Sequence, residues 1–110
     1  MLWSFAEVKP VYLQNIFKVY KPGEQILGDH NVLQWASEHG ITMVGYSSLN
    51  SWPQVLQPLR DPHVELVAKA KGRTTAQVLL RWALQHHVAV IPKASSLQRM
   101  RENAQLMDFE

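Results

Sequence analysis

The sequence contains no cysteine among its 110 residues. This absence excludes disulfide bonds and thiolate metal sites, and it favours a reducing, cytoplasmic location. No segment approaches the roughly 20 consecutive apolar residues that a membrane span needs. The N-terminal residues also lack the basic region and apolar core of a signal peptide. The net charge of +2 is too small to indicate nucleic acid or a membrane surface as a partner.

Catalytic and metal-binding arrangements are also missing. The five histidines do not have the spacing of a metal site. No Ser/His/Asp arrangement is indicated, and Asp29 and Asp61 are placed as helix caps rather than as a catalytic pair. We therefore assign no catalytic residue and no metal ligand.

What the sequence does contain is a regular alternation of apolar segments and helix signals. Strands are expected at 11–14, 41–46 and 88–91, the last of them buried on both faces. Capping residues predict helices from Asp29 to about His39, from Asp61 to about Lys71 and from Thr74 to about His86. Strands alternating with helices favour an α/β fold with a parallel sheet.

The last strand leads into a potential anion site. Pro92 ends the strand because it has no N–H to donate, and Lys93 follows at once. Ser95 or Ser96 can cap a helix that begins at Leu97.

Further features of this helix start strengthen the anion-site interpretation. Ser95 with Gln98 fits a capping box, and Arg99 falls in the first turn, beside free N–H groups that favour an anion. The alternative is a turn followed by an amphipathic helix with solvated basic residues.

Polar residues follow all three expected strands. Parallel β/α units bind ligands at the carboxyl ends of their strands. Gln14, the segment 46–51 and the segment 93–96 all fall at those ends. Three parallel strands also leave two open sheet edges. We expect the chain to be part of a larger barrel or sheet, or to be completed by a partner.

Three separated motifs resemble the aldo-keto reductases. They are Tyr-Ser-Ser-Leu-Asn-Ser at 46–51, Thr-Thr-Ala-Gln-Val-Leu-Leu-Arg-Trp at 74–82 and Ile-Pro-Lys at 91–93. The resemblance covers nearly the whole chain, so residues 1–110 are treated as one partial domain. It implies the C-terminal part of a TIM (β/α)8 barrel, with the three strands as the sixth, seventh and eighth.

The resemblance also implies a binding site for NADPH or NADP. The nicotinamide would be held by Gln14 at its carboxamide and by Tyr46 against its ring. The pyrophosphate would lie against the loop through Ser47, Leu49 and Ser51.

The adenosine end of the cofactor would lie against the last helix and the residues before it. Lys93 and Arg99 match the cations at the 2′-phosphate, with Ser95 and Ser96 close by, and Glu102 and Asn103 match the polar pair at the adenine.

Three positions depart from the family pattern. Ser48 and Asn50 stand where the family usually has proline and glycine, and Asn50 is a residue type that can take the left-handed conformation. Ala94 stands where the family often has a serine, which removes one hydroxyl from the phosphate site.

The implied activity is NADPH-dependent reduction of aldehydes or ketones to alcohols, with a small carbonyl compound as substrate. The family's catalytic Asp, Tyr, Lys and His lie on earlier strands, in sequence that this chain does not contain. We therefore expect the isolated chain to be inactive and to need the missing part of the barrel or self-association. The alternative is a noncatalytic remnant of the fold that binds a dinucleotide or a partner.

Overall fold

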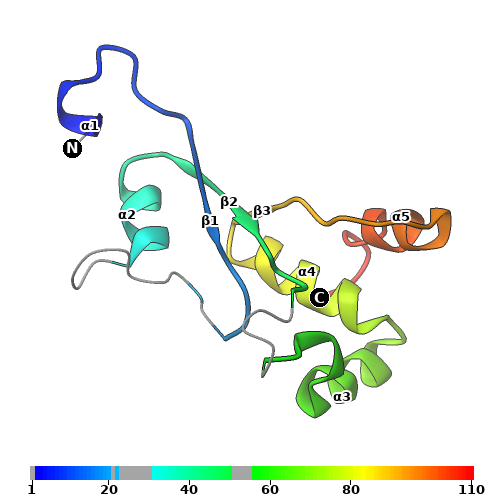
Figure 1. Ribbon diagram of the computed structural model, residues 1–110. Coiled ribbons are helices and arrows are strands. Elements are labelled where there is room, and N and C mark those ends of the chain that lie inside the picture. The colour runs from blue at the N-terminus through cyan, green and yellow to red at the C-terminus, as the bar shows by residue number, and fades with distance from the viewer. Residues whose placement is uncertain (1, 21, 23–30, 51–55) are drawn as a thin grey trace.

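The protein is described by a computed structural model that covers residues 2–20, 22, 31–50 and 56–110. Within these ranges, strands alternate with helices along the chain (Figure 1). In order, the elements are α1 (Leu2–Phe5), β1 (Tyr12–Ile16), α2 (Val32–Glu38), β2 (Thr42–Tyr46), the 3₁₀ helix η1 (Pro58–Arg60), α3 (Pro62–Lys71), α4 (Thr75–Gln85), β3 (Ala89–Val90) and α5 (Leu97–Ala104).

The strands form one parallel sheet in the order β1-β2-β3, which confirms the predicted α/β class. Gln14 lies opposite Val44, and Val44 lies opposite Ala89. The carboxyl ends of the strands therefore meet at one edge of the sheet, where Tyr46 is paired with Ile16. This edge is where parallel β/α units place their ligands.

The core lies between one face of the sheet and the helices that cover it. Phe17, Met43, Ala83 and Val88 form a buried cluster that joins the sheet to α4. Gly45 belongs to the same layer, because a Cβ there would lie 2.9 Å from both Phe17 Cβ and Val88 Cγ1. Such distances leave no space for a side chain, so the close packing of β2 on this layer requires glycine.

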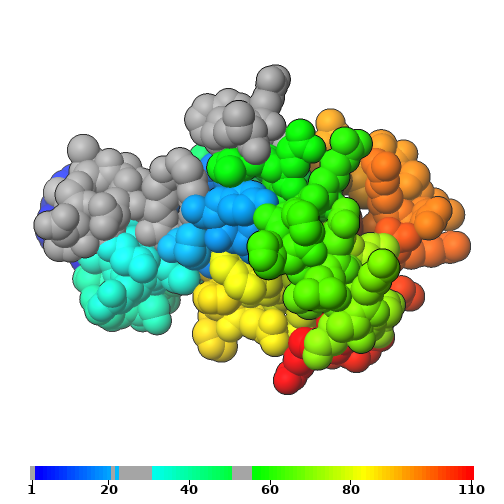
Figure 2. All heavy atoms as spheres, turned by 90° about the horizontal axis from the view of Figure 1, so that it is seen from below, coloured from blue at the N-terminus to red at the C-terminus, as the bar shows by residue number. Residues whose placement is uncertain are grey.

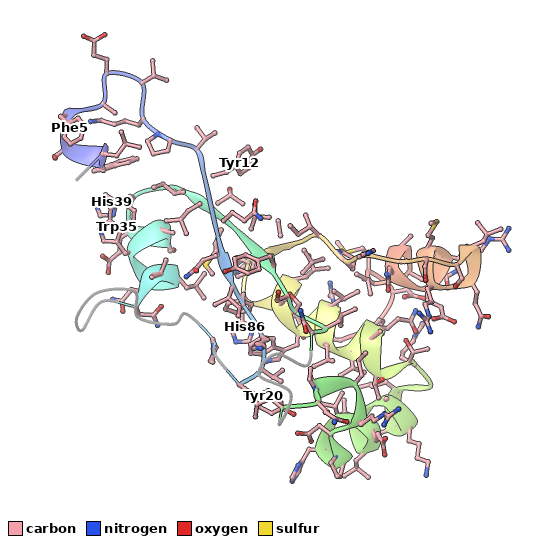
Figure 3. All side chains as sticks on the ribbon, in the orientation of Figure 1. Phe5, Tyr12, Tyr20, Trp35, His39 and His86 are labelled. Atoms are coloured by element: carbon pink, nitrogen blue, oxygen red, sulfur yellow. The ribbon has the colours of Figure 1, made fainter. Side chains whose placement is uncertain are left out.

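The opposite face of the sheet is open within the described residues. Tyr12 is 67% exposed and Ile91 is 54% exposed, and Tyr12 projects from β1 on the side away from α2 (Figure 3). The expectation that residues 88–91 are buried on both faces is therefore wrong for this chain. Val88 is buried on the core side, whereas Ile91 points to the side that no helix covers.

The helix ends follow the local signals in the sequence. Asp61 caps α3 by accepting a hydrogen bond from the His63 N–H at 2.9 Å. Thr74 and Gln77 form the predicted capping box at the start of α4. Gly72 has the left-handed conformation that ends α3 (φ +61°).

Several boundaries differ from the sequence-based expectation. β3 covers only Ala89–Val90 of the strand expected at 88–91. β1 extends to Ile16, because its backbone continues to pair with β2 as far as Tyr46. Gln14 consequently lies in the middle of β1 and not at its carboxyl end. The N-cap of α2 is Asn31, whose side chain accepts from two backbone N–H groups, while the predicted cap Asp29 lies outside the described residues.

The tryptophans in the described ranges pack as expected. Trp35 stacks on His39 with ring centroids 4.2 Å apart, and both rings lie on one side of α2 (Figure 3). Trp3 meets Trp35 edge to face at 5.9 Å. On the same, helix-covered face of the sheet, Trp82 of α4 stacks on Phe17 at 5.0 Å. These contacts tie α1 to α2 and α4 to the sheet.

Candidate functional site

A cavity of about 300 Å³ lies at the carboxyl ends of β2 and β3. Its size is at the lower end of the range for small-molecule sites. It brings together two loops that are far apart in the sequence, and its lining residues are Gly45, Ser47, Ser48, Leu49, Asn50, Ile91, Pro92 and Lys93. Three of these had been assigned from the sequence: Ser47, Leu49 and Lys93.

The loop after β2 is shaped by Ser47. This residue has φ +59°, the left-handed region that non-glycine residues rarely occupy. A hydrogen bond from the Asn50 N–H to the Ser47 carbonyl oxygen, at 3.1 Å, then closes the turn. The left-handed conformation in this loop thus belongs to Ser47 and not to Asn50. Strained backbone of this kind often accompanies a binding loop.

Ser48 is the residue that the sequence did not assign. It is only 8% exposed, and its hydroxyl oxygen has no hydrogen-bond partner among the described residues. A buried hydroxyl without a partner is costly. Ser48 belongs to the lining of the cavity, but its hydroxyl oxygen is enclosed and would have to turn toward the cavity to donate to a ligand. Residue type alone does not predict this burial, because it depends on the folded arrangement of the loop.

Lys93 is the charged residue in the lining of the cavity. It follows β3 and is exposed, so its ammonium group can reach a ligand without being desolvated beforehand. A cation in the lining of such a cavity is suited to an anionic group such as a phosphate or pyrophosphate. The residues present therefore fit the phosphate part of a dinucleotide.

Gln14 and Tyr46 lie on the open face of the sheet, next to the cavity end of β2. Both are exposed, and the strand register places Gln14 beside Val44 and Ile16 beside Tyr46. Because side chains alternate along a strand, Gln14, Val44 and Tyr46 share one face. A flat ring system placed on this face would have the Tyr46 ring and the Gln14 amide on the same side.

The N-terminus of α5 is capped by Ser96. Its hydroxyl accepts from the Arg99 N–H at 3.3 Å, and the helix begins at Leu97 as expected. The alternative capping box between Ser95 and Gln98 is not formed, because the N-cap is Ser96. The Gln98 amide nitrogen donates to the Glu102 carboxylate at 2.9 Å. Ser95 is exposed just before the cap.

The remaining predicted residues lie along α5. Arg99 is exposed in its first turn, while Glu102 and Asn103 are half-buried in its second half. α5 is reached from β3 by an extended segment and lies to one side of the sheet (Figure 1). The structure thus places Ser47, Leu49 and Lys93 around one cavity and Arg99, Glu102 and Asn103 on a separate helix. Ser51 lies outside the described residues.

The described residues show neither a metal site nor a membrane span. They contain no group of three or more His, Asp or Glu side chains that could hold a metal ion. None of their helices combines the length and apolar character needed to cross a bilayer.

Comparison with known proteins decides the family. The model of the Aldo/keto reductase family matches residues 1–110. The chain belongs to the aldo/keto reductase family. It is 34% identical over 119 aligned residues to the NAD(P)H-dependent pentose reductase of Pyricularia oryzae, covering 99% of this chain and 34% of that protein. It is 35% identical to aldo-keto reductase family 1 member A1 of Xenopus tropicalis, covering 96% of this chain and 32% of that protein.

Solved structures of aldo-keto reductases support the same fold. The aldose reductase of Schistosoma japonicum superposes with a TM-score of 0.82 at 30% identity, over 97% of this chain and 32% of that one. A Gox0644 variant in complex with NADPH gives a TM-score of 0.82 at 25% identity, over 98% and 36%. This aldo-keto reductase chain thus has the TIM-barrel fold of its family in partial form, and it spans about a third of the length of the relatives it matches.

Proposed function

We propose that this chain forms the dinucleotide-binding end of an NADPH-dependent aldo-keto reductase that reduces aldehydes or ketones to alcohols. The observation that carries the proposal is the cavity at the ends of β2 and β3, whose lining includes Ser47, Ser48 and Lys93. Relatives described as NAD(P)H-dependent and a solved NADPH complex support this choice of ligand.

In this proposal, the chain's own residues bind and orient the cofactor. The Ser48 hydroxyl turns toward the cavity to donate a hydrogen bond to the pyrophosphate, and Lys93 and Arg99 make charge-assisted contacts with the 2′-phosphate. Tyr46 supports the nicotinamide ring on the open face of the sheet, and Gln14 fixes its carboxamide. When bound, the reduced nicotinamide supplies the hydride for the carbonyl carbon. Fixing the ring in this way raises the fraction of bound cofactor in a reactive geometry.

The direct test is an NADPH fluorescence titration of the 110-residue chain, with its fold checked by circular dichroism. Lys93→Ala is expected to weaken binding about tenfold or more, since one charge-assisted contact contributes roughly 1.5–3 kcal/mol. Lys69→Ala is the matched control, because it removes the same charge from α3.

A second pair of variants tests the hydroxyl. Ser48→Ala should weaken NADPH binding by a smaller factor, about fivefold for one neutral hydrogen bond. Ser37→Ala, on the exposed side of α2, should leave it unchanged. A folded chain without saturable NADPH binding, or equal losses in Lys93→Ala and Lys69→Ala, would overturn the proposed function.

A further inference from the structure

The helix α5 carries three residues of the proposed adenosine site, yet it has no buried residue of its own. Arg99, Glu102 and Asn103 all belong to it, and it lies at one edge of the molecule (Figures 1 and 2). A short helix without an apolar anchor must be held by polar contacts and by the chain on either side. Whatever fixes α5 therefore also fixes the adenosine contacts.

The side chain of Gln77 makes this connection. Its amide nitrogen Nε2 donates to the Glu102 carbonyl oxygen and to the Gln105 carbonyl oxygen, at 3.1 Å each. These are carbonyls at the C-terminal end of α5, where a helix leaves its acceptors unsatisfied. Gln77 is only 4% exposed, so water does not compete with these bonds.

The oxygen of the same side-chain amide makes its hydrogen bonds at the start of α4. The oxygen Oε1 accepts from the Thr74 N–H at 3.1 Å and from the Thr74 hydroxyl at 3.4 Å. Both ends of the Gln77 amide are thus occupied, the oxygen by the start of α4 and the nitrogen by the end of α5. This arrangement fixes the orientation of the amide and leaves no freedom for a flip.

We propose that Gln77 is a positioning residue that holds α5, and with it Arg99, at a fixed place relative to the cavity. The expected effect on cofactor binding rests on the proposed function. The hydrogen bonds between Gln77 and α5 do not depend on it. Leu106, which is buried, and the ion pair between Arg73 and Asp108 at 2.6 Å hold the chain beyond α5. Gln77 differs from them because it binds the helix end directly.

The two functions of Gln77 can be separated by a single substitution. Gln77→Glu keeps an oxygen for the Thr74 N–H, and glutamate is a standard partner in a capping box. The same change removes both donors to α5 and places a carboxylate against two carbonyl oxygens. Amides at the end of α5 should then lose about tenfold or more of their hydrogen-exchange protection, while the first turn of α4 keeps its own.

The control is Gln85→Glu, which makes the same chemical change at the exposed end of the same helix. It should leave α5 protection unchanged. Gln77→Leu is the second comparison, because it removes the α4 cap together with the α5 contacts. Protection should fall in both helices in that variant.

Cofactor titration provides the readout that a purely structural role would not change. In Gln77→Glu, affinity for NADPH should fall several-fold more than affinity for NADH. Both cofactors lose the adenine contacts of Glu102 and Asn103, whereas NADPH alone also loses the contact of Arg99 with its 2′-phosphate. Unchanged α5 protection, or equal losses for the two cofactors, would overturn the inference. If the wild-type chain binds neither cofactor, the proposed function fails, while the exchange data still decide whether Gln77 holds α5.

Discussion

The residues proposed to bind the cofactor differ in how far the sequence could identify them. Lys93 and Arg99 follow recognisable local signals, a strand end and a capped helix start. Ser48 does not, because its burial depends on distant parts of the chain. Gln77 has a local signal for its capping box, but its contacts with the end of α5 depend on distant parts of the chain. The unpartnered hydroxyl of Ser48 and the doubly bonded amide of Gln77 exist only once β2, α4 and α5 are assembled. Ser47 likewise takes the left-handed conformation for reasons that its residue type does not reveal.

Arg99 is expected to set the preference for NADPH. It is an exposed cation in the first turn of α5, where it can pair with a 2′-phosphate. Arg99→Ala should cost about 1.5–3 kcal/mol in NADPH binding and little in NADH binding. Parallel titrations with both cofactors measure this difference, and equal weakening of the two would remove Arg99 from the 2′-phosphate site.

The hydrogen bond between Tyr20 and Asp61 predicts a pH dependence of stability. The Tyr20 hydroxyl donates to Asp61 Oδ2 at 2.6 Å. This bond, followed by burial and the negative charge of Asp61, raises the pKa of Tyr20 to about 12. The same bond, followed by the His63 N–H, lowers the pKa of Asp61.

The sign follows from the protonation state that each shift favours. The raised Tyr20 pKa gives stability that is present below pH 10 and lost as pH rises from about 10 to about 12. The lowered Asp61 pKa gives stability that is lost as pH falls below the carboxyl's ordinary value of 3.8. Urea unfolding should therefore show Tyr20→Phe less stable than wild type between pH 5 and 9, with the difference shrinking at both extremes. A difference that does not vary with pH would contradict this account.

Among the elements, the helices were predicted better than the strands. Caps such as Asp61 and Thr74 are local, so residue type and spacing were enough to identify them. The limits of β1 and β3 depend on pairing with β2, which sequence alone does not specify. The apolar pattern at 88–91 indicated a strand buried on both faces. It does not reveal which residues would pack against the face that is open within the described residues.

The ends of α3 and α4 provide a paired prediction about stability. Gly72 ends α3 with φ +61°, whereas His87 follows α4 with φ +59° and carries a side chain. Gly72→Ala should destabilise the chain by about 1 kcal/mol, because alanine is strained in the left-handed region. His87→Gly should stabilise the chain by about 0.5 kcal/mol. Glycine relieves the strain of the left-handed conformation, and this gain is partly offset by the larger backbone entropy that glycine loses on folding. Thermal or urea unfolding that gave both variants the same sign would contradict this assignment.

For the whole molecule, the open face of the sheet is the dominant feature. Tyr12, Tyr46 and Ile91 are exposed on it, and β1 and β3 are the two edges of the described sheet. Unpaired edges and uncovered apolar side chains favour association. We expect the isolated chain to be marginally stable and to self-associate unless a complementary part of a barrel is supplied.

The isolated chain is also expected not to reduce carbonyl compounds. Carbonyl reduction needs an acid beside the carbonyl oxygen, and such a group typically contributes ~10²–10⁴-fold in rate. Tyr20 is a poor candidate because its pKa is raised to about 12, which makes it a weaker acid. NADPH oxidation with several aldehydes should show no turnover above background. A monomer with protected amides that reduces an aldehyde would contradict both this prediction and the expected marginal stability.

The central claim is that the cavity at the ends of β2 and β3 and the start of α5 bind one dinucleotide. The most direct measurement is amide hydrogen exchange of the 110-residue chain with and without saturating NADPH. We predict added protection in residues 47–50 and 93–100, with no change in α3. Protection confined to α3 and the outer face of α4, or a saturable complex that leaves both predicted segments unchanged, would contradict the account.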